Sequence, residues 1–87
     1  GLDTAELTEL FSWNEATWLE RTRGSAIRRI GYERWLRNIA VALGNAVSSP
    51  AVIDALTARR DSDSPLVSEH VEWALQQHTE KKNVRGT

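Results

Sequence analysis

A dense group of arginines between positions 23 and 44 is the part of this sequence best suited to chemistry. The same stretch is marked by glycines, and the residues are Arg23, Arg28, Arg29, Arg34 and Arg37 with Gly24, Gly31 and Gly44. An arginine side chain is a planar, permanently charged fork of donors that fits phosphate and carboxylate oxygens. The whole chain has 87 residues and a net charge of −1, so the basic character is local. We therefore predict an anionic partner, and a nucleic-acid backbone is the first candidate.

The arginines could also have a purely structural role, as partners in surface ion pairs. Two acid–base pairs have helical spacing, Glu20 with Arg23 and Glu33 with Arg37. Surface pairs of this kind contribute about 0.3–0.5 kcal/mol each. They explain one or two arginines, but not the whole group. The candidate binding residues are Arg28, Arg29, Arg34, Arg37 and Asn38, and the backbone amides that open the helix after Gly31 would add to an anion site.

Other reactive side chains are sparse. The chain has no cysteine, so neither a disulfide nor an iron–sulfur or thiolate–zinc site can be built from it alone. His70 and His78 lack the i, i+4 spacing or the further ligands of a metal site, so we expect structural or solvent-facing histidines. We predict no catalytic, cofactor-binding or metal-binding residue here, and the chain by itself is not expected to be an enzyme.

The elements that position the arginines are predicted to be helices. Glycine, proline and Ser/Asp clusters separate segments of helical spacing, and no alternating strand pattern competes. The fold class is therefore all-α, a small bundle of about five short helices. The helical segments cover residues 3–11, 12–23, 25–30, 32–43, 50–60 and 65–78. We expect a single helical domain over residues 1–78 and a frayed polar tail over residues 79–87.

Caps and apolar spacing support this division. Ser12-x-x-Glu15 has the form of a capping box, Gly24 stands where a left-handed cap would fall, and Gly44 is expected to break a helix. The core face of the longest helix is predicted to hold Trp35, Leu36, Ile39, Ala40 and Leu43. Trp35 and Trp73 are placed in the core, while the positions of Trp13 and Trp18 stay open.

Two helices opened by Ser49-Pro50 and Ser64-Pro65 suggest one helical-repeat unit. The second of them resembles the second helix of a HEAT-like repeat, through Asp63-x-Pro-x-Val67 followed by Trp73-Ala-Leu75. Such repeats leave a concave surface for ligands. Ser68 departs from the pattern, because many HEAT-like repeats carry a basic residue there.

Two longer motifs carry a family resemblance. Gly-x-Ala-Ile-Arg-Arg (24–29) and Leu-Arg-Asn-x-x-Val-Ala-Leu-Gly-Asn (36–45) closely resemble the C-terminal region of epoxyqueuosine reductase. The resemblance spans residues 10–78. It implies a parent oxidoreductase with a cobalamin-binding domain and two 4Fe–4S clusters that reduces epoxyqueuosine to queuosine in the anticodon loop of tRNA. The ligands of those cofactors would lie upstream of the matched region.

The resemblance implies an accessory role. Its basic positions match the candidate arginines, which would touch the backbone phosphates of a tRNA anticodon stem-loop and help to place it over the cobalamin. Asn38 and Asn45 match family asparagines, and helix capping is the structural alternative for both. A second possibility is a HEAT-like protein-interaction module that docks on the upstream catalytic domains of the same polypeptide without touching RNA. We expect a cytoplasmic protein with no membrane partner.

Overall fold

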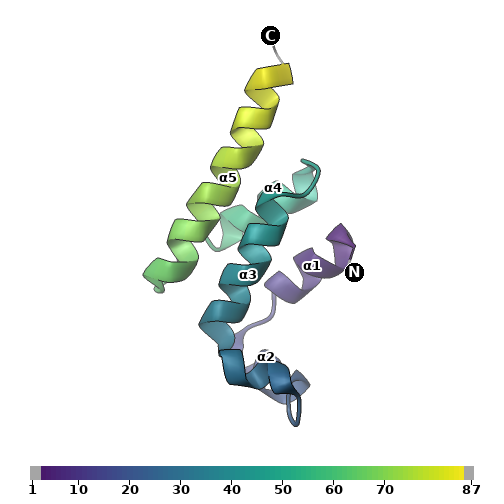
Figure 1. The fold of residues 1–87 in the computed structure, drawn as a ribbon, viewed down its shortest axis with the longest axis vertical. Coiled ribbons are helices and arrows are strands. Elements are labelled where there is room, and N and C mark those ends of the chain that lie inside the picture. Colours follow the sequence, from purple (N-terminus) through teal and green to yellow (C-terminus); the bar gives the residue numbers. More distant parts are fainter. Residues whose placement is uncertain (1–2, 86–87) are drawn as a thin grey trace.

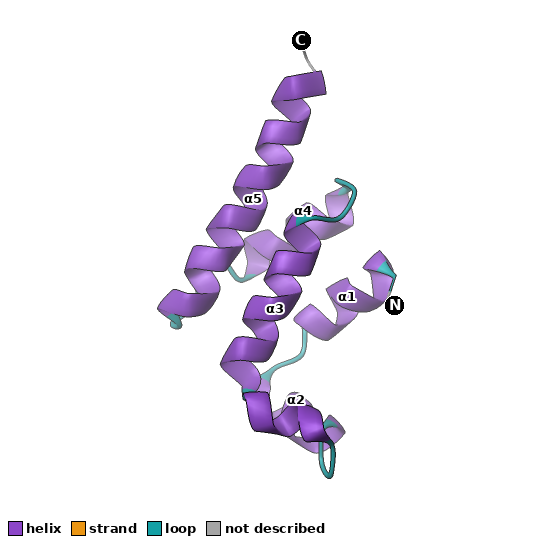
Figure 2. Ribbon diagram, viewed as in Figure 1, coloured by secondary structure: helices purple, strands orange, loops and turns teal. Residues whose placement is uncertain are grey.

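The computed structural model describes residues 3–85, and in this range the fold contains helices and no strand (Figure 2). The elements are α1 (Thr4–Phe11), α2 (Glu15–Arg21), the 3₁₀ helix η1 (Ala26–Ile30), α3 (Tyr32–Gly44), α4 (Pro50–Ala58) and α5 (Pro65–Arg85). The all-α prediction is confirmed. Residues 1–2 and 86–87 lie outside the described part.

Helix α3 is the centre of the bundle. It packs against α1, α2, η1, α4 and most extensively α5, which runs beside it in the same direction (Figure 1). The predicted core face is confirmed, since Trp35, Leu36, Ile39, Ala40 and Leu43 are all buried. An amphipathic helix with this spacing has to bury one face, so it becomes the element that positions the rest.

Most of the expected helix starts are confirmed. The Oγ atoms of Ser25, Ser49 and Ser64 accept hydrogen bonds from backbone amides in the first turns of η1, α4 and α5. The capping box at Ser12 is wrong. Ser12 closes α1 by donating its Oγ–H to the carbonyl of Glu9 (2.6 Å), and Asn14 caps α2 by accepting from the Thr17 amide (2.8 Å). The side chain of Ser12 bonds backward, so it cannot cap the following helix.

Helix α5 corrects the placement of Trp73. Its buried residues are Val67, Val71, Ala74 and His78, a narrow stripe at helical spacing. Trp73 lies one position off this stripe and is 39% exposed, whereas Trp18, whose position was open, is only 2% exposed. Helix α3 ends at Gly44 as expected, but this glycine has no positive φ and is needed for close packing against α5. Gly44 is buried inside α3, where a Cβ would approach Trp73 Cζ3 to 2.5 Å and the Ala74 Cα to 3.0 Å.

Helix α5 continues through the polar stretch after His78 and ends at Arg85. The domain limits of 1–78 and 79–87 stay a prediction. None of the helices between residues 3 and 85 has the length and apolar character that crossing a membrane requires.

Candidate nucleic-acid interface

The turn that carries Arg28 and Arg29 is held by a glycine at each side. Gly24 and Gly31 have φ angles of +77° and +86°, a region that L side chains rarely adopt. The predicted left-handed conformation of Gly24 is therefore confirmed, although α2 already ends at Arg21 and Thr22 is its C-cap residue. Between the two glycines, η1 forms a short 3₁₀ turn that leaves both arginines exposed.

The other three candidates lie on α3. Arg34, Arg37 and Asn38 are one turn apart and occupy the side of the helix opposite its buried stripe. Arg34 and Asn38 are exposed, and Arg37 is half-buried. The Arg37 Nε–H donates to Asn38 Oδ1 (2.9 Å), so the asparagine holds the guanidinium instead of capping the helix.

The five predicted residues lie on η1 and on the first two turns of α3, and α2, η1 and the start of α3 together form one end of the molecule (Figure 1). We call residues 21–37 the basic end. This stretch holds six arginines and a single carboxylate, Glu33. The predicted Glu20–Arg23 and Glu33–Arg37 pairs are not formed, since the one ion pair among the described residues joins Arg60 to Glu72. Glu33 instead accepts a hydrogen bond from the Ser64 hydroxyl.

An aromatic cluster supports the basic end from inside. The rings of Trp13 and Trp35 stack at 5.7 Å, and those of Tyr32 and Trp18 lie 6.2 and 6.1 Å from Trp35. The Arg21 guanidinium lies 5.9 Å from the Trp13 ring centroid, within cation–π range. Trp18 is buried and Trp13 is half-buried beside Arg21, so both rings pack against the start of α3 and neither is fully exposed for stacking on bases.

Arg59 is a structural arginine that the sequence did not reveal. Its Nε–H donates to the Phe11 carbonyl (2.6 Å), and its Nη2 donates to the Trp13 carbonyl (2.7 Å) and to the Tyr32 hydroxyl (3.1 Å). The Tyr32 hydroxyl in turn donates to the Trp13 carbonyl (2.5 Å). Arg59 thus ties the end of α4 to the α1–α2 connection and to the start of α3. No local pattern could have found it, because its partners are 27–48 positions away.

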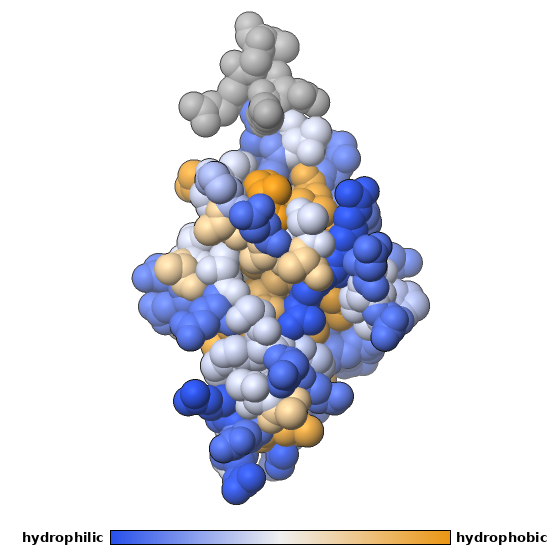
Figure 3. All heavy atoms as spheres, turned by 180° about the vertical axis from the view of Figure 1, so that it is seen from behind, coloured by the Kyte–Doolittle hydropathy of each residue, from blue (hydrophilic) through white to orange (hydrophobic). Residues whose placement is uncertain are grey.

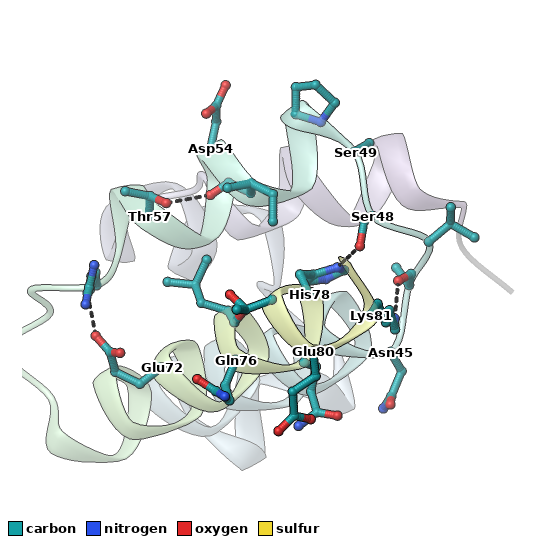
Figure 4. A pocket seen from close by; sticks show the side chains of 18 residues that line it. Asn45, Ser48, Ser49, Asp54, Thr57, Glu72, Gln76, His78, Glu80 and Lys81 are labelled. Atoms are coloured by element: carbon teal, nitrogen blue, oxygen red, sulfur yellow. Dashed lines mark hydrogen bonds and ion pairs between the residues drawn. The ribbon is translucent and has the colours of Figure 1, made fainter. Parts of the chain in front are cut away.

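A groove of about 1310 Å³ lies away from the basic end, between the loop after α3, α4 and one face of α5 (Figure 4). We call it the α4–α5 groove. Its carboxylates are Asp54, Glu72 and Glu80, and its cations are Arg60 and Lys81. None of the five candidate residues lines it. Its charge therefore does not favour a nucleic acid.

The two histidines and Asn45 have structural roles. His78 is buried at the base of the α4–α5 groove, where its Nε2 donates to the Leu43 carbonyl (2.7 Å) and its Nδ1 hydrogen-bonds with the Ser48 hydroxyl (2.5 Å). His70 Nδ1 contacts the Leu66 carbonyl at 2.7 Å. Asn45 Nδ2 donates to the Val41 carbonyl (3.1 Å). Asn45 therefore caps the end of α3, as the structural explanation of this residue predicted. Among the described residues, no cluster of three or more His, Asp or Glu has the arrangement of a metal site.

Comparison with known proteins gives a consistent family. Epoxyqueuosine reductase of Pseudomonas aeruginosa is 63% identical over 79 residues, which cover 91% of this chain and 22% of the relative. Those of Xanthomonas campestris and Escherichia coli are 64% and 52% identical, over 88% and 94% of this chain and 22% and 21% of the relatives. No family model and no solved structure gave a significant match. The chain is therefore homologous to the epoxyqueuosine reductases, over a segment that spans about a fifth of their length.

Proposed function

We propose that this chain is an accessory C-terminal helical domain of an epoxyqueuosine reductase, and that its basic end holds the anticodon stem-loop of a tRNA. Other parts of the enzyme would reduce epoxyqueuosine to queuosine. The identity of 50–64% to reductases of that name supports the enzyme class. The parent protein would be an oxidoreductase of the cytoplasm, where tRNA is modified.

The observation that carries the proposal is uncompensated positive charge. The basic end has six arginines against one carboxylate, and none of the six forms an ion pair within the described part of the chain. The carboxylate of Glu33 is bound to Ser64. Exposed guanidinium groups without a partner favour phosphate oxygens, which accept two parallel hydrogen bonds from one arginine.

The contact between Arg37 and Asn38 fits a positioning role. With Nε engaged by Asn38 Oδ1, the terminal nitrogens of Arg37 are left for a ligand and the side chain loses less freedom on binding. Phosphate contacts of this kind set the register of a nucleic acid without reading its sequence. Recognition of the modified base would therefore fall to the rest of the enzyme.

The cofactors of the parent enzyme would also lie outside this chain. Iron–sulfur clusters are held by cysteine thiolates, and this chain has no cysteine. In the proposal, cobalamin and two 4Fe–4S clusters are bound by the preceding domains. Helices α4 and α5 pack against each other and against α3, and in the proposal they form a HEAT-like pair that braces α3.

Binding of an anticodon stem-loop at several salt concentrations tests the proposal. The logarithm of the binding constant should fall with the logarithm of salt concentration, with a slope of about 0.7–0.9 per phosphate contact. Replacing both Arg34 and Arg37 by alanine should lower that slope by about 1.5, because two contacts are lost. Fluorescence anisotropy of a labelled stem-loop gives both the affinity and the slope.

A charge-matched control separates contact from general attraction. Arg34→Ala and Arg60→Ala each remove one exposed positive charge, but Arg60 lies outside the basic end and is already paired with Glu72. We expect Arg34→Ala to weaken binding and Arg60→Ala to leave it unchanged. Equal losses for the two variants, or a slope near zero for the unchanged chain, would contradict the proposal.

A further inference from the structure

The apolar edge of η1 is the surface feature that the proposed function leaves unexplained. In a 3₁₀ helix, side chains three residues apart lie on the same edge, which places Ile27 beside Ile30. The two side chains are 47% and 42% exposed. Viewed from behind, an apolar patch lies among hydrophilic side chains at this end of the molecule (Figure 3).

The backbone of η1, which carries Ile27 and Ile30, is held at both of its ends. Gly24 and Gly31 set the backbone on either side of η1, and Ser25 caps its start. Within the described residues, the main packing of η1 is against α3. The turn therefore presents its apolar edge without having to reorganise, which lowers the entropic cost of docking.

We propose that Ile27 and Ile30 dock against an apolar surface on the remainder of the longer reductase polypeptide. The identity of this partner rests on the proposed function. The relatives are several times longer than this chain, which covers 20–22% of them, so a protein surface of the same polypeptide is available. Arg28 and Arg29 flank the isoleucines on the other edges of the turn, so the docked surface would border the arginines assigned to RNA.

Two other occupants fit the chemistry less well. A second copy of the chain meeting the same edge across a two-fold axis would bring Arg28 and Arg29 against their own copies, which is repulsive. Single-stranded RNA is recognised by stacking of bases on aromatic or guanidinium planes, and this edge offers aliphatic side chains. A protein surface can pack against isoleucine at interior density.

Hydrogen exchange tests the docking in the absence of RNA. The Pseudomonas aeruginosa reductase would carry this chain in place of its own matched segment, and the exchange of its η1 amides would be compared with that of the 87-residue chain alone. We expect exchange at positions 27–31 to slow by about tenfold or more in the long protein. Equal exchange in the two proteins would overturn the proposal.

Variants sharpen the test. Replacing Ile27 and Ile30 together by serine should lower the melting temperature of the 87-residue chain to some extent, because both side chains are half-buried, and should lower that of the long protein by clearly more. Val47→Ser is the matched control, because Val47 is 85% exposed and lies in the loop before α4. A similar loss in both proteins would mean that the isoleucines only stabilise the bundle. Because no RNA is present, this result is independent of whether the arginines bind a stem-loop.

Discussion

The basic end and the α4–α5 groove differ in whether their cationic side chains have bonding partners. In the groove, Arg60 is bound to Glu72 at 2.5 Å, and Lys81 Nζ donates to the Ala46 carbonyl at 2.7 Å. At the basic end, Arg28 and Arg34 have no carboxylate within 4.0 Å among the described residues. A chain with a net charge of −1 can therefore present positive charge at one end, while Arg59, Arg60 and Lys81 are bound to groups of the fold itself.

The largest expected effect comes from Arg59, which ties the end of α4 to the α1–α2 connection and to the start of α3. Arg59→Ala removes three hydrogen bonds to Phe11, Trp13 and Tyr32. We expect the free energy of unfolding to fall by about 2 kcal/mol, because two partly buried carbonyls lose a charged donor and the Trp13 carbonyl keeps only the Tyr32 hydroxyl. Urea denaturation followed by tryptophan fluorescence measures this change. A loss no larger than that of Arg60→Ala would show that Arg59 does not brace the basic end.

The second prediction concerns the close contact between α3 and α5 beside the groove. Gly44→Ala brings a methyl group to 3.0 Å from the Ala74 Cα, a backbone atom that cannot rotate away. Overpacking costs about 1–3 kcal/mol, and the better helix propensity of alanine returns about 1 kcal/mol. We expect a net loss of about 1 kcal/mol by chemical denaturation. Removing the Trp73 ring as well should restore only part of it, and a stabilised Gly44→Ala chain would refute the tight contact.

The smallest expected effect concerns the ion pair between Arg60 and Glu72 in the α4–α5 groove. Arg60 and Glu72 are both exposed, so their ion pair is strongly screened by solvent. Arg60→Gln should change the free energy of unfolding by no more than about 0.5 kcal/mol. The same denaturation experiment checks it at low and high salt. A loss above 1 kcal/mol would mean that the groove depends on this pair more than its exposure suggests.

Local patterns predicted most of the fold because they depend on neighbours in sequence. The Ser-Pro starts at Ser49 and Ser64 and the buried face of α3 follow from spacing and capping chemistry alone. The capping prediction for Ser12 was wrong because Asn14 lies directly before α2 and caps it. The prediction for Trp73 was wrong because the buried face of α5 depends on how α5 packs against α3. The residue type alone does not indicate that packing.

The candidate site was predictable only in part. The sequence pointed to Arg28, Arg29, Arg34, Arg37 and Asn38, and the structure places them on η1 and on the first two turns of α3. Which arginines are free could not be known from the sequence, because it depends on distant partners. Arg59 and Arg60 are adjacent, yet one binds α1–α2 and the other binds α5. The contact between Arg37 and Asn38 is local, but nothing in the spacing distinguishes it from a capping role.

The central claim is that Arg28 and Arg34 of the basic end are free to bind phosphate, whereas Arg59 and Arg60 are bound to groups of the fold. The Nε–Hε signals of Arg28, Arg34 and Arg59 in an NMR titration with an anticodon stem-loop at low salt test it most directly. We predict that Arg28 and Arg34 shift and that added salt reverses the shifts, while Arg59 stays in place because it is bound to the Phe11 carbonyl. Unchanged signals for Arg28 and Arg34 in the folded chain would contradict the account.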